Sequence, residues 1–198
     1  MTVNSRIRIA TEHDSPAILG IYAPFIKNTP ITFEYKVPSE NEFSQRMKRL
    51  QEQYPWLVYE IDQKIVGYAY ADKHHEREAY KWSVHYSVYI DPEYQGKGIG
   101  TQLYTAMTEI LRIQGYYNAY AIITSPNMQS ERFHELFGFK PIGFFKHTGY
   151  KLGSWHDVSW YELAIHEISN EPKEPKSITE VVNIEEIINR AVQPQRLV

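Results

Sequence analysis

The chain has 198 residues, of which 42% are apolar and 23% are charged, a composition typical of one globular domain or of one domain with an appendage. Its formal net charge of −3 argues against nucleic acid and anionic membranes as partners, and no apolar run is long enough to span a bilayer. The sequence has no cysteine, which excludes disulfides, zinc–thiolate sites and a thiol nucleophile, and its first residues lack a signal-peptide core, so a cytoplasmic location is expected.

The first part of the chain predicts two helices and three strands. The stretch RIRIA alternates as a strand does, and DSPAILGIYAPFIKNT follows with Pro16 near the first helical position and its apolar residues on one face. Ser39 and Glu42 form a capping-box pattern that opens a second helix, expected to end near Gln53. The runs WLVYEI and KIVGYAYA then form a pair of strands joined by a polar turn at residues 62–63.

The second part adds four strands and two helices. YKWSVHYSVYI is a long strand, followed by a glycine-rich segment and a helix from about Ile99 to Gln114. NAYAII is a strand, SPNMQSERFHELFGF contains a short helix that ends at Gly138, and KPIGFFKHTGYKLG and WHDVSWYELAI are the last two strands. Strands with interspersed helices in this order predict an α/β (α+β) domain with a mixed sheet.

The composition changes near Ile168, which we take as the end of a domain that spans residues 1–167. The segment SNEPKEPKS has two prolines and alternating charges, so residues 168–177 read as a linker. Ser177 and Glu180 repeat the capping-box pattern before an apolar stripe, which predicts a C-terminal helical appendage over residues 178–198. Because so short a helix is marginal alone, we expect it to dock on the domain or on a second subunit.

The glycine-rich segment QGKGIG, residues 95–100, lies between a strand and a helix, where a bare backbone and free N–H groups can bind an anion. A P-loop would need serine or threonine after the lysine, but Lys97 is followed by Gly98. The glycine spacing and the position in mid-chain also exclude a dinucleotide fingerprint. A tight turn without a ligand remains an alternative.

The segment resembles the Gln/Arg-x-x-Gly-x-Gly/Ala signature of the GNAT acetyltransferases, and ERFHELFGF follows about thirty residues later, as in that family. Five blocks are similar to phosphinothricin N-acetyltransferases and to acetyltransferases of methionine sulfone and sulfoximine: YPWLVYE, REAYKWSV, SVYIDPEYQGKGIGTQLYTAM, SERFHELFGF and GYKLGSWHDVSW. The resemblance runs from about Arg6 to His166. It implies a mixed, mostly antiparallel, splayed sheet flanked by helices, acetyl-CoA as cofactor, a small amino-acid-like amine as substrate, and a homodimer.

In this family, backbone N–H groups of the glycine loop hold the pyrophosphate of acetyl-CoA, and N–H groups at the end of the preceding strand polarise the thioester carbonyl. The resemblance therefore places the diphosphate on residues 96–101. Asn127, just before the short helix, is expected to hydrogen-bond the pantetheine or the amine, unless it is a simple turn residue. The expected cofactor-binding residues are Val88, Tyr89, Ile90, Gln95, Gly96, Lys97, Gly98, Ile99, Gly100, Thr101 and Asn127.

Two histidines are the expected catalytic residues. His134 occupies the position where many GNAT enzymes carry a tyrosine that protonates the thiolate. An imidazole that titrates near neutral pH could protonate the thiolate or assist the amine, and the alternative is a surface histidine on a short helix. His85 stands where the phosphinothricin enzymes carry a glutamate, and strand periodicity puts it on one face with Ser83 and Ser87. His85 is therefore the base for the amine, a residue that lines the pocket, or a structural histidine. Deprotonation could instead run through ordered water, since a fraction of free amine is always present.

Three residues are expected to contact the substrate. Arg77 matches an arginine near the substrate of the related enzymes and would bind a carboxylate, unless it is an exposed loop arginine. Phe33 and Tyr80 would pack on the side chain of the amine, with ordinary burial as the alternative. The adjacent pair His74-His75 has no carboxylate at ligand spacing, so we expect a solvated loop and no metal site.

The absence of cysteine favours direct acetyl transfer in a ternary complex. Two alternatives remain open. The histidine in place of glutamate allows a non-catalytic acyl-CoA-binding or regulatory module, and the same chemistry would serve an enzyme that acetylates a protein N-terminus or an antibiotic amine.

Overall fold

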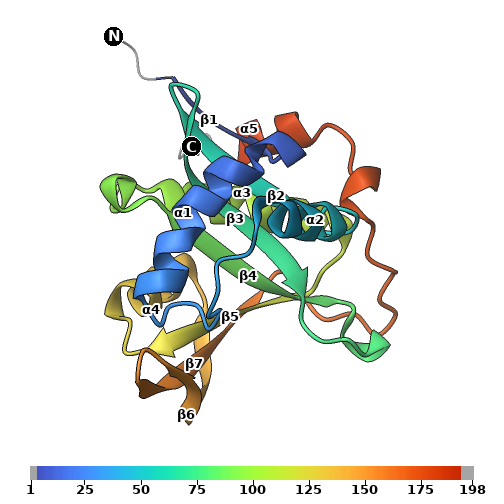
Figure 1. Cartoon of the computed structure of the whole chain (residues 1–198). Coiled ribbons are helices and arrows are strands. Elements are labelled where there is room, and N and C mark those ends of the chain that lie inside the picture. Colours follow the sequence, from blue (N-terminus) through green and yellow to red (C-terminus); the bar gives the residue numbers. More distant parts are fainter. Residues whose placement is uncertain (1–3, 193–198) are drawn as a thin grey trace.

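The computed structural model describes residues 4–192, which form one seven-stranded sheet with helices on both faces (Figure 1). The helices are α1 Ser15–Asn28, α2 Glu40–Leu50, α3 Ile99–Gln114, α4 Met128–Phe137 and α5 Ile184–Val192. The strands are β1 Ser5–Ile9, β2 Trp56–Ile61, β3 Lys64–Lys73, β4 Ser83–Ile90, β5 Asn118–Ser125, β6 Lys140–Lys151 and β7 Ser154–Ala164. None of the described helices is long and apolar enough to cross a membrane.

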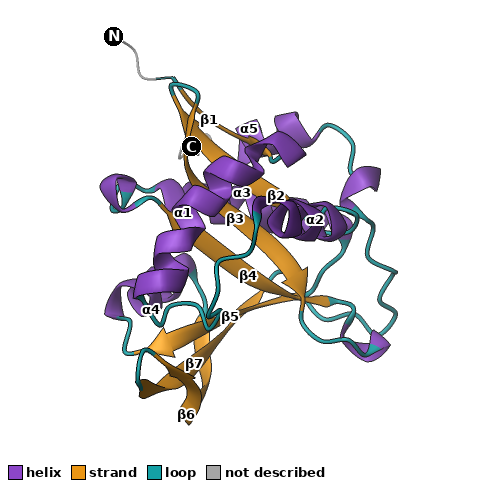
Figure 2. Ribbon diagram, viewed as in Figure 1, coloured by secondary structure: helices purple, strands orange, loops and turns teal. Residues whose placement is uncertain are grey.

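The strand order is β1-β2-β3-β4-β5-β7-β6, and every neighbouring pair is antiparallel except β4 and β5. The parallel pairing of β4 with β5 covers only residues 83–85 and 118–120, after which the two strands diverge (Figure 2). Residues 86–90 of β4 therefore have a strand neighbour on the β3 side alone. The predicted mixed, mostly antiparallel, splayed sheet is confirmed.

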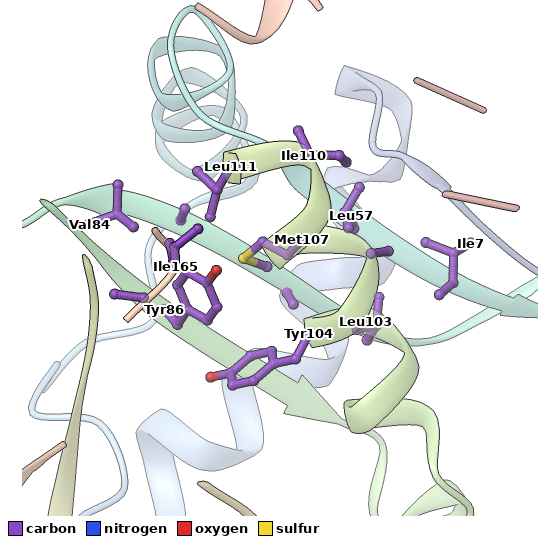
Figure 3. Packing of buried hydrophobic residues seen from close by; sticks show 14 of the residues in the cluster. Ile7, Leu57, Val84, Tyr86, Leu103, Tyr104, Met107, Ile110, Leu111 and Ile165 are labelled. Atoms are coloured by element: carbon purple, nitrogen blue, oxygen red, sulfur yellow. The ribbon is translucent and has the colours of Figure 1, made fainter. Parts of the chain in front are cut away.

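Two hydrophobic layers hold the sheet, and the alternation of strand side chains assigns residues to them. Leu57 packs in the layer under α3, whereas its neighbours Trp56 and Val58 pack under α1 and α2. Figure 3 shows the α3 layer, in which Met107 and Tyr104 lie over the sheet close to Tyr86. The amphipathic pattern of α3 thus fixes the helix that carries the glycine turn onto the centre of the sheet.

Local signals in the sequence account for most element boundaries. Ser39 and Glu42 make the predicted capping box, and α2 ends at Leu50, three residues before the expected end. Asp62 and Gln63 both have positive φ angles, 47° and 69°, as a tight hairpin turn requires. Gly138 ends α4 with a φ of 111°, as predicted.

The prediction of one C-terminal helix starting at Ser177 is wrong in its first part. The capping box forms, but it opens only a 3-10 turn. Asn183, with a φ of 58°, then interrupts the helical conformation before α5 begins. The segment docks on the domain, because its apolar residues join the α3 layer and the Gln114 side-chain amide donates to the carbonyl oxygen of Lys176 at 2.8 Å. The last six residues of the expected appendage, 193–198, lie outside the described residues.

Candidate active site

The glycine turn before α3 has the conformation that an anion site needs. Gly96 and Gly98 have φ angles of 73° and 77°, and a Cβ atom built on either would meet no heavy atom within 4 Å. Gly98 is the N-cap of α3 and has no side chain to accept hydrogen bonds from the first-turn N–H groups. Gly100 differs, because its Cβ would lie 3.3 Å from the ring of Phe133, so it allows α3 and α4 to approach. The turn therefore presents uncapped helix donors to open space.

A cavity of about 420 Å³ extends from this turn along the end of β4 to the start of α4. Ten of the predicted cofactor-binding residues line it: Val88, Tyr89, Ile90, Gln95, Gly96, Gly98, Ile99, Gly100, Thr101 and Asn127. Lys97 is exposed and does not line the cavity. Its amine donates to the carbonyl oxygen of Glu93 at 3.0 Å and lies 4.7 Å from the ring centroid of Tyr94.

A second, smaller cavity of about 70 Å³ lies in the gap between the diverging ends of β4 and β5, which we call the splay. It is lined by β4 and β5 and, from the helices, by Tyr104, Ser130 and His134. Five residues line both cavities: Ile31, Val88, Tyr89, Asn127 and Ser130. The large cavity therefore meets the splay at a defined junction, where a group carried by a bound cofactor can reach the space between the strands.

His134 lies at the splay, but its chemistry differs from the prediction. The side chain is buried, and its Nδ1 atom lies 2.8 Å from the Ser130 carbonyl oxygen, so Nδ1–H donates there. Nε2 must then accept from the Tyr104 hydroxyl at 3.1 Å. Burial lowers the pKa of His134 to about 4, and the imidazole is neutral at pH 7. Desolvation of the ring thus shifts the pKa of His134 below the near-neutral value that the prediction assumed.

His85 lies at the last paired position of β4 with β5, on the polar face that the periodicity predicts. Its Nε2 atom lies 3.0 Å from Nδ1 of His74, whose ring stacks on Tyr120 at a centroid distance of 4.2 Å. Burial, and then the neighbouring His74, lower the pKa of His85 to about 4. The predicted solvated loop is therefore wrong for His74, which covers His85, and fits His75, which is exposed.

The predicted substrate residues do not line either cavity. Arg77 and Tyr80 lie on the exposed loop between β3 and β4, where the Tyr80 ring contacts His74 and His75. Phe33 lies on the loop between α1 and α2, and its ring occupies the space that a side chain at Gly149 would need. The structure thus distributes the three residues over two loops. No group of three or more histidine or acidic residues that could hold a metal ion occurs within residues 4–192.

Two residues of the splay were missed by the sequence reasoning. Ser130 lies three positions after the N-cap Asn127 and four before His134, a helical spacing that places it beside both, so the sequence contained the signal. Tyr104 belongs to the apolar stripe of α3 and reads as an ordinary core residue; only the fold brings its hydroxyl to His134.

A splayed sheet with an uncapped glycine turn on the central helix defines the class of protein. The family model "Acetyltransferase (GNAT) domain" matches residues 7–160, and the chain belongs to this family. It is an N-acetyltransferase of the GNAT family.

Within the family, the chain is similar to enzymes that acetylate small amines. It is 34% identical over 175 residues to the phosphinothricin N-acetyltransferase of Streptomyces viridochromogenes, with 88% of this chain and 95% of the relative covered. It is 31% identical over 172 residues to the L-methionine sulfoximine/L-methionine sulfone acetyltransferase of Pseudomonas paraeruginosa, with 86% of this chain and all of the relative covered. A phosphinothricin acetyltransferase from Sinorhizobium meliloti, solved in complex with acetyl-CoA, is 32% identical and superposes with a TM-score of 0.81, covering 88% of this chain and 95% of its own.

Proposed function

We propose that this protein transfers the acetyl group of acetyl-CoA to the amine of a small amino-acid-like substrate of the phosphinothricin or methionine sulfoximine type. The observation that carries the proposal is the junction between the cofactor cavity and the splay. A thioester held there is open to attack by an amine that enters between β4 and β5. Two relatives, which this chain matches over nearly their full length, are named for acetylation of phosphinothricin and of methionine sulfoximine or sulfone, and they support the same substrate class.

The first task of the site is to hold the cofactor. The N–H groups of residues 96–101 bind the diphosphate, because the start of a helix offers free donors and a partial positive charge. The pantetheine then follows the β4 edge that has no β5 partner, where N–H groups of residues 88–90 bind the thioester carbonyl oxygen. Lys97 contributes charge from outside the cavity.

The second task is the loss of a proton from the substrate ammonium. The amine of such a substrate titrates above pH 7, so only a small fraction of it is the free amine at pH 7. Burial lowers the pKa of His85 and of His134 to about 4, which makes both imidazoles weak bases, and His74 occupies Nε2 of His85. We therefore assign His85, which lines neither cavity, a structural role and let the proton leave through water. Acetyl transfer is direct, because the chain has no cysteine to carry the acyl group.

A second candidate function is an acyl-CoA-binding module without turnover. It is favoured by one observation, the neutral and covered His85 at the position of the family glutamate. The module would keep the glycine turn and the cofactor cavity unchanged. The two functions differ in whether any amine is consumed.

The deciding experiment measures thiol release from acetyl-CoA with a panel of amines that includes phosphinothricin, methionine sulfoximine, methionine sulfone, ordinary amino acids, N-terminal peptides and antibiotic amines. The proposal predicts saturable turnover with one or more of the amino-acid analogues and formation of the N-acetyl product. Tight binding of acetyl-CoA with no turnover of any amine would support the binding module. Turnover of the peptides or antibiotics alone would change the partner and keep the chemistry.

We further infer a homodimer. The hairpin of β6 and β7 lies at one edge of the sheet and exposes apolar side chains that a monomer would leave in water: Ile142, Phe144, Phe145, Tyr150, Leu152 and Trp155. A second copy packed on this hairpin would cover them. Multi-angle light scattering of the full chain is expected to give about twice the chain mass of 23.3 kDa, and a concentration-independent monomer would contradict the inference.

A further inference from the structure

The junction of the two cavities contains few polar side chains. Of the five residues shared by both cavities, Ile31 and Val88 are apolar. Tyr89 turns its ring toward the α1 layer, where it contacts Tyr22 and Phe25, so its hydroxyl lies away from the junction. Asn127 and Ser130 remain as the side-chain donors among the shared residues. Under the proposed function, on which this inference rests, the departing sulfur is released at this junction.

The two donors differ in what they can do for a thiolate. The Asn127 side-chain oxygen accepts from the Ser130 N–H at 3.2 Å, which leaves its amide N–H groups to hold a ligand, but an amide does not exchange protons readily. A hydroxyl can donate one proton while it accepts another. Ser130 is half-buried on the first turn of α4 and lines both cavities, so its hydroxyl can serve both sides of the junction.

His134 is placed to orient Ser130 and not to act on the sulfur itself. Its Nδ1–H donates to the Ser130 carbonyl oxygen at 2.8 Å and lies 3.4 Å from the Ser130 hydroxyl oxygen. Its Nε2 atom accepts from Tyr104. With both nitrogens occupied inside the protein, the imidazole has no N–H to offer to the junction. It holds the first turn of α4 and keeps the Ser130 hydroxyl hydrogen free to point outward.

We propose that Ser130 is a catalytic residue whose hydroxyl donates its hydrogen to the departing coenzyme A sulfur, and that His134 is a positioning residue for it. In the transfer step the carbon–nitrogen bond forms and the carbon–sulfur bond breaks. The nitrogen loses one proton and the sulfur gains one. The Ser130 oxygen accepts the proton from nitrogen, directly or through water, as its own proton passes to sulfur, so the hydroxyl ends unchanged and no net charge is left at the junction.

The first test uses the binary complex with coenzyme A and needs no amine. A donor to the thiolate stabilises its charged form, so the thiol pKa of bound coenzyme A should lie below that of free coenzyme A. Ultraviolet absorbance of the thiolate against pH is expected to show this shift in the wild type. The Ser130→Ala variant should raise the bound thiol pKa by about one unit, a tenfold change in the ionisation constant. An equal thiol pKa in the variant and the wild type would overturn the proposal.

The matched control is Ser125→Ala. Ser125 precedes the same helix, but its hydroxyl donates to Glu131 at 2.7 Å and lines neither cavity. This variant should leave the bound thiol pKa and kcat unchanged. Thermal unfolding of each variant establishes that it is folded, and coenzyme A titration should give Kd values within about threefold of the wild type. A Ser125→Ala effect equal to that of Ser130→Ala would show a disturbance of α4 and overturn the assignment.

The second test is a double-mutant cycle on turnover. Ser130→Ala should lower kcat by about 100-fold with little change in KM, and Ser130→Thr, which keeps a hydroxyl, should recover part of the loss. His134→Asn should lower kcat in the wild type but add little in the Ser130→Ala background, because it acts through that hydroxyl. Additive effects would remove His134 from its positioning role. Failure of the proposed function appears separately, as no turnover of any amine by the wild type.

Discussion

The Tyr104 hydroxyl lies 3.1 Å from Nε2 of His134, so a residue of the central helix α3 is joined to α4 beside the splay. Both side chains are buried, and the bond fixes His134 as a neutral imidazole with its hydrogen on Nδ1. The pair therefore serves the architecture of the junction. It also makes the protein sensitive to acid, since protonation of His134 would bury a charge.

The pH dependence of stability tests this protonation state. The folded-state pKa of His134 is about 4, below the ordinary value of 6.5, because burial disfavours the charged form. Stability is therefore complete above pH 6.5 and is lost as pH falls toward 4, by about 3 kcal/mol for one such group. Denaturant unfolding between pH 7 and 4 is expected to show a smaller loss for His134→Gln than for the wild type. Equal losses would mean that the ring is already charged or exposed.

Alanine substitutions at two glycines distinguish the effect of backbone strain from the loss of cofactor binding. Gly98→Ala places a side chain in the left-handed region and in the space assigned to the diphosphate. We expect acetyl-CoA affinity to fall by at least tenfold in isothermal titration calorimetry, together with a loss of stability of about 1 kcal/mol.

Gly153→Ala is the control for this variant. Gly153 has a φ of 80° and an equally open surrounding, but it lies in the turn between β6 and β7, away from the cofactor cavity. It should carry a similar strain and bind acetyl-CoA normally. If Gly98→Ala retains full affinity, the diphosphate lies elsewhere.

The C-terminal segment is expected to contribute to stability and not to catalysis. Ile188 is 1% exposed in the α3 layer, and Ile188→Ala should lower the free energy of unfolding by about 2–5 kcal/mol. Val182, 76% exposed in the same segment, provides the control, since Val182→Ala should change it by less than about 0.5 kcal/mol. Urea unfolding measures both. A small effect of Ile188→Ala would show that the segment is detached in solution.

A buried ion cluster near the N-terminus predicts a second acid response. Arg8 donates two hydrogen bonds to Asp14, at 2.6 and 2.8 Å, and also bonds to the buried Glu60. Burial alone would raise the pKa of Asp14, but Arg8 and the Thr11 N–H outweigh it and lower that pKa. The cluster therefore stabilises the fold above about pH 4, the ordinary carboxyl range, and stops doing so as pH falls through the lowered value.

The corresponding variant is Arg8→Met, which leaves two buried carboxylates short of a partner. It should destabilise the protein at pH 7 by about 3–5 kcal/mol, and the difference from the wild type should shrink below pH 4. Lys48→Met removes an exposed pair with Glu12 and should cost less than about 1 kcal/mol at either pH. An Arg8→Met effect that does not depend on pH would show that lost packing, and not charge, is responsible.

Local sequence rules predicted most helix and turn boundaries, because each boundary depends on residues close together in the chain. The capping box at Ser39, the hairpin turn at 62–63 and the end of α4 at Gly138 depend on a few neighbouring residues, and each occurs as expected. The prediction of one C-terminal helix failed because a capping box indicates only where a helix begins, and not that Asn183 shortly after it adopts a left-handed conformation. Ten of the residues that line the cofactor cavity, among them the glycine turn and Asn127, were also predicted, from the glycine motif and its resemblance to the family.

Long-range contacts were not recoverable. The protonation states of His85 and His134 depend on burial and on partners 11 and 30 residues away, His74 and Tyr104, which no local pattern brings together. Phe33 was predicted beside the substrate from its type alone, and the fold places its ring over Gly149. Residue type indicates the chemistry that is available, whereas topology decides which of it reaches the site.

The most direct measurement is a crystal structure with acetyl-CoA bound. It should show the diphosphate within hydrogen-bond distance of backbone N–H groups between Gly96 and Thr101, the thioester sulfur beside the Ser130 hydroxyl, and the acetyl carbonyl on the β4 edge. A diphosphate bound away from the start of α3, or a thioester outside the gap between β4 and β5, would contradict the account.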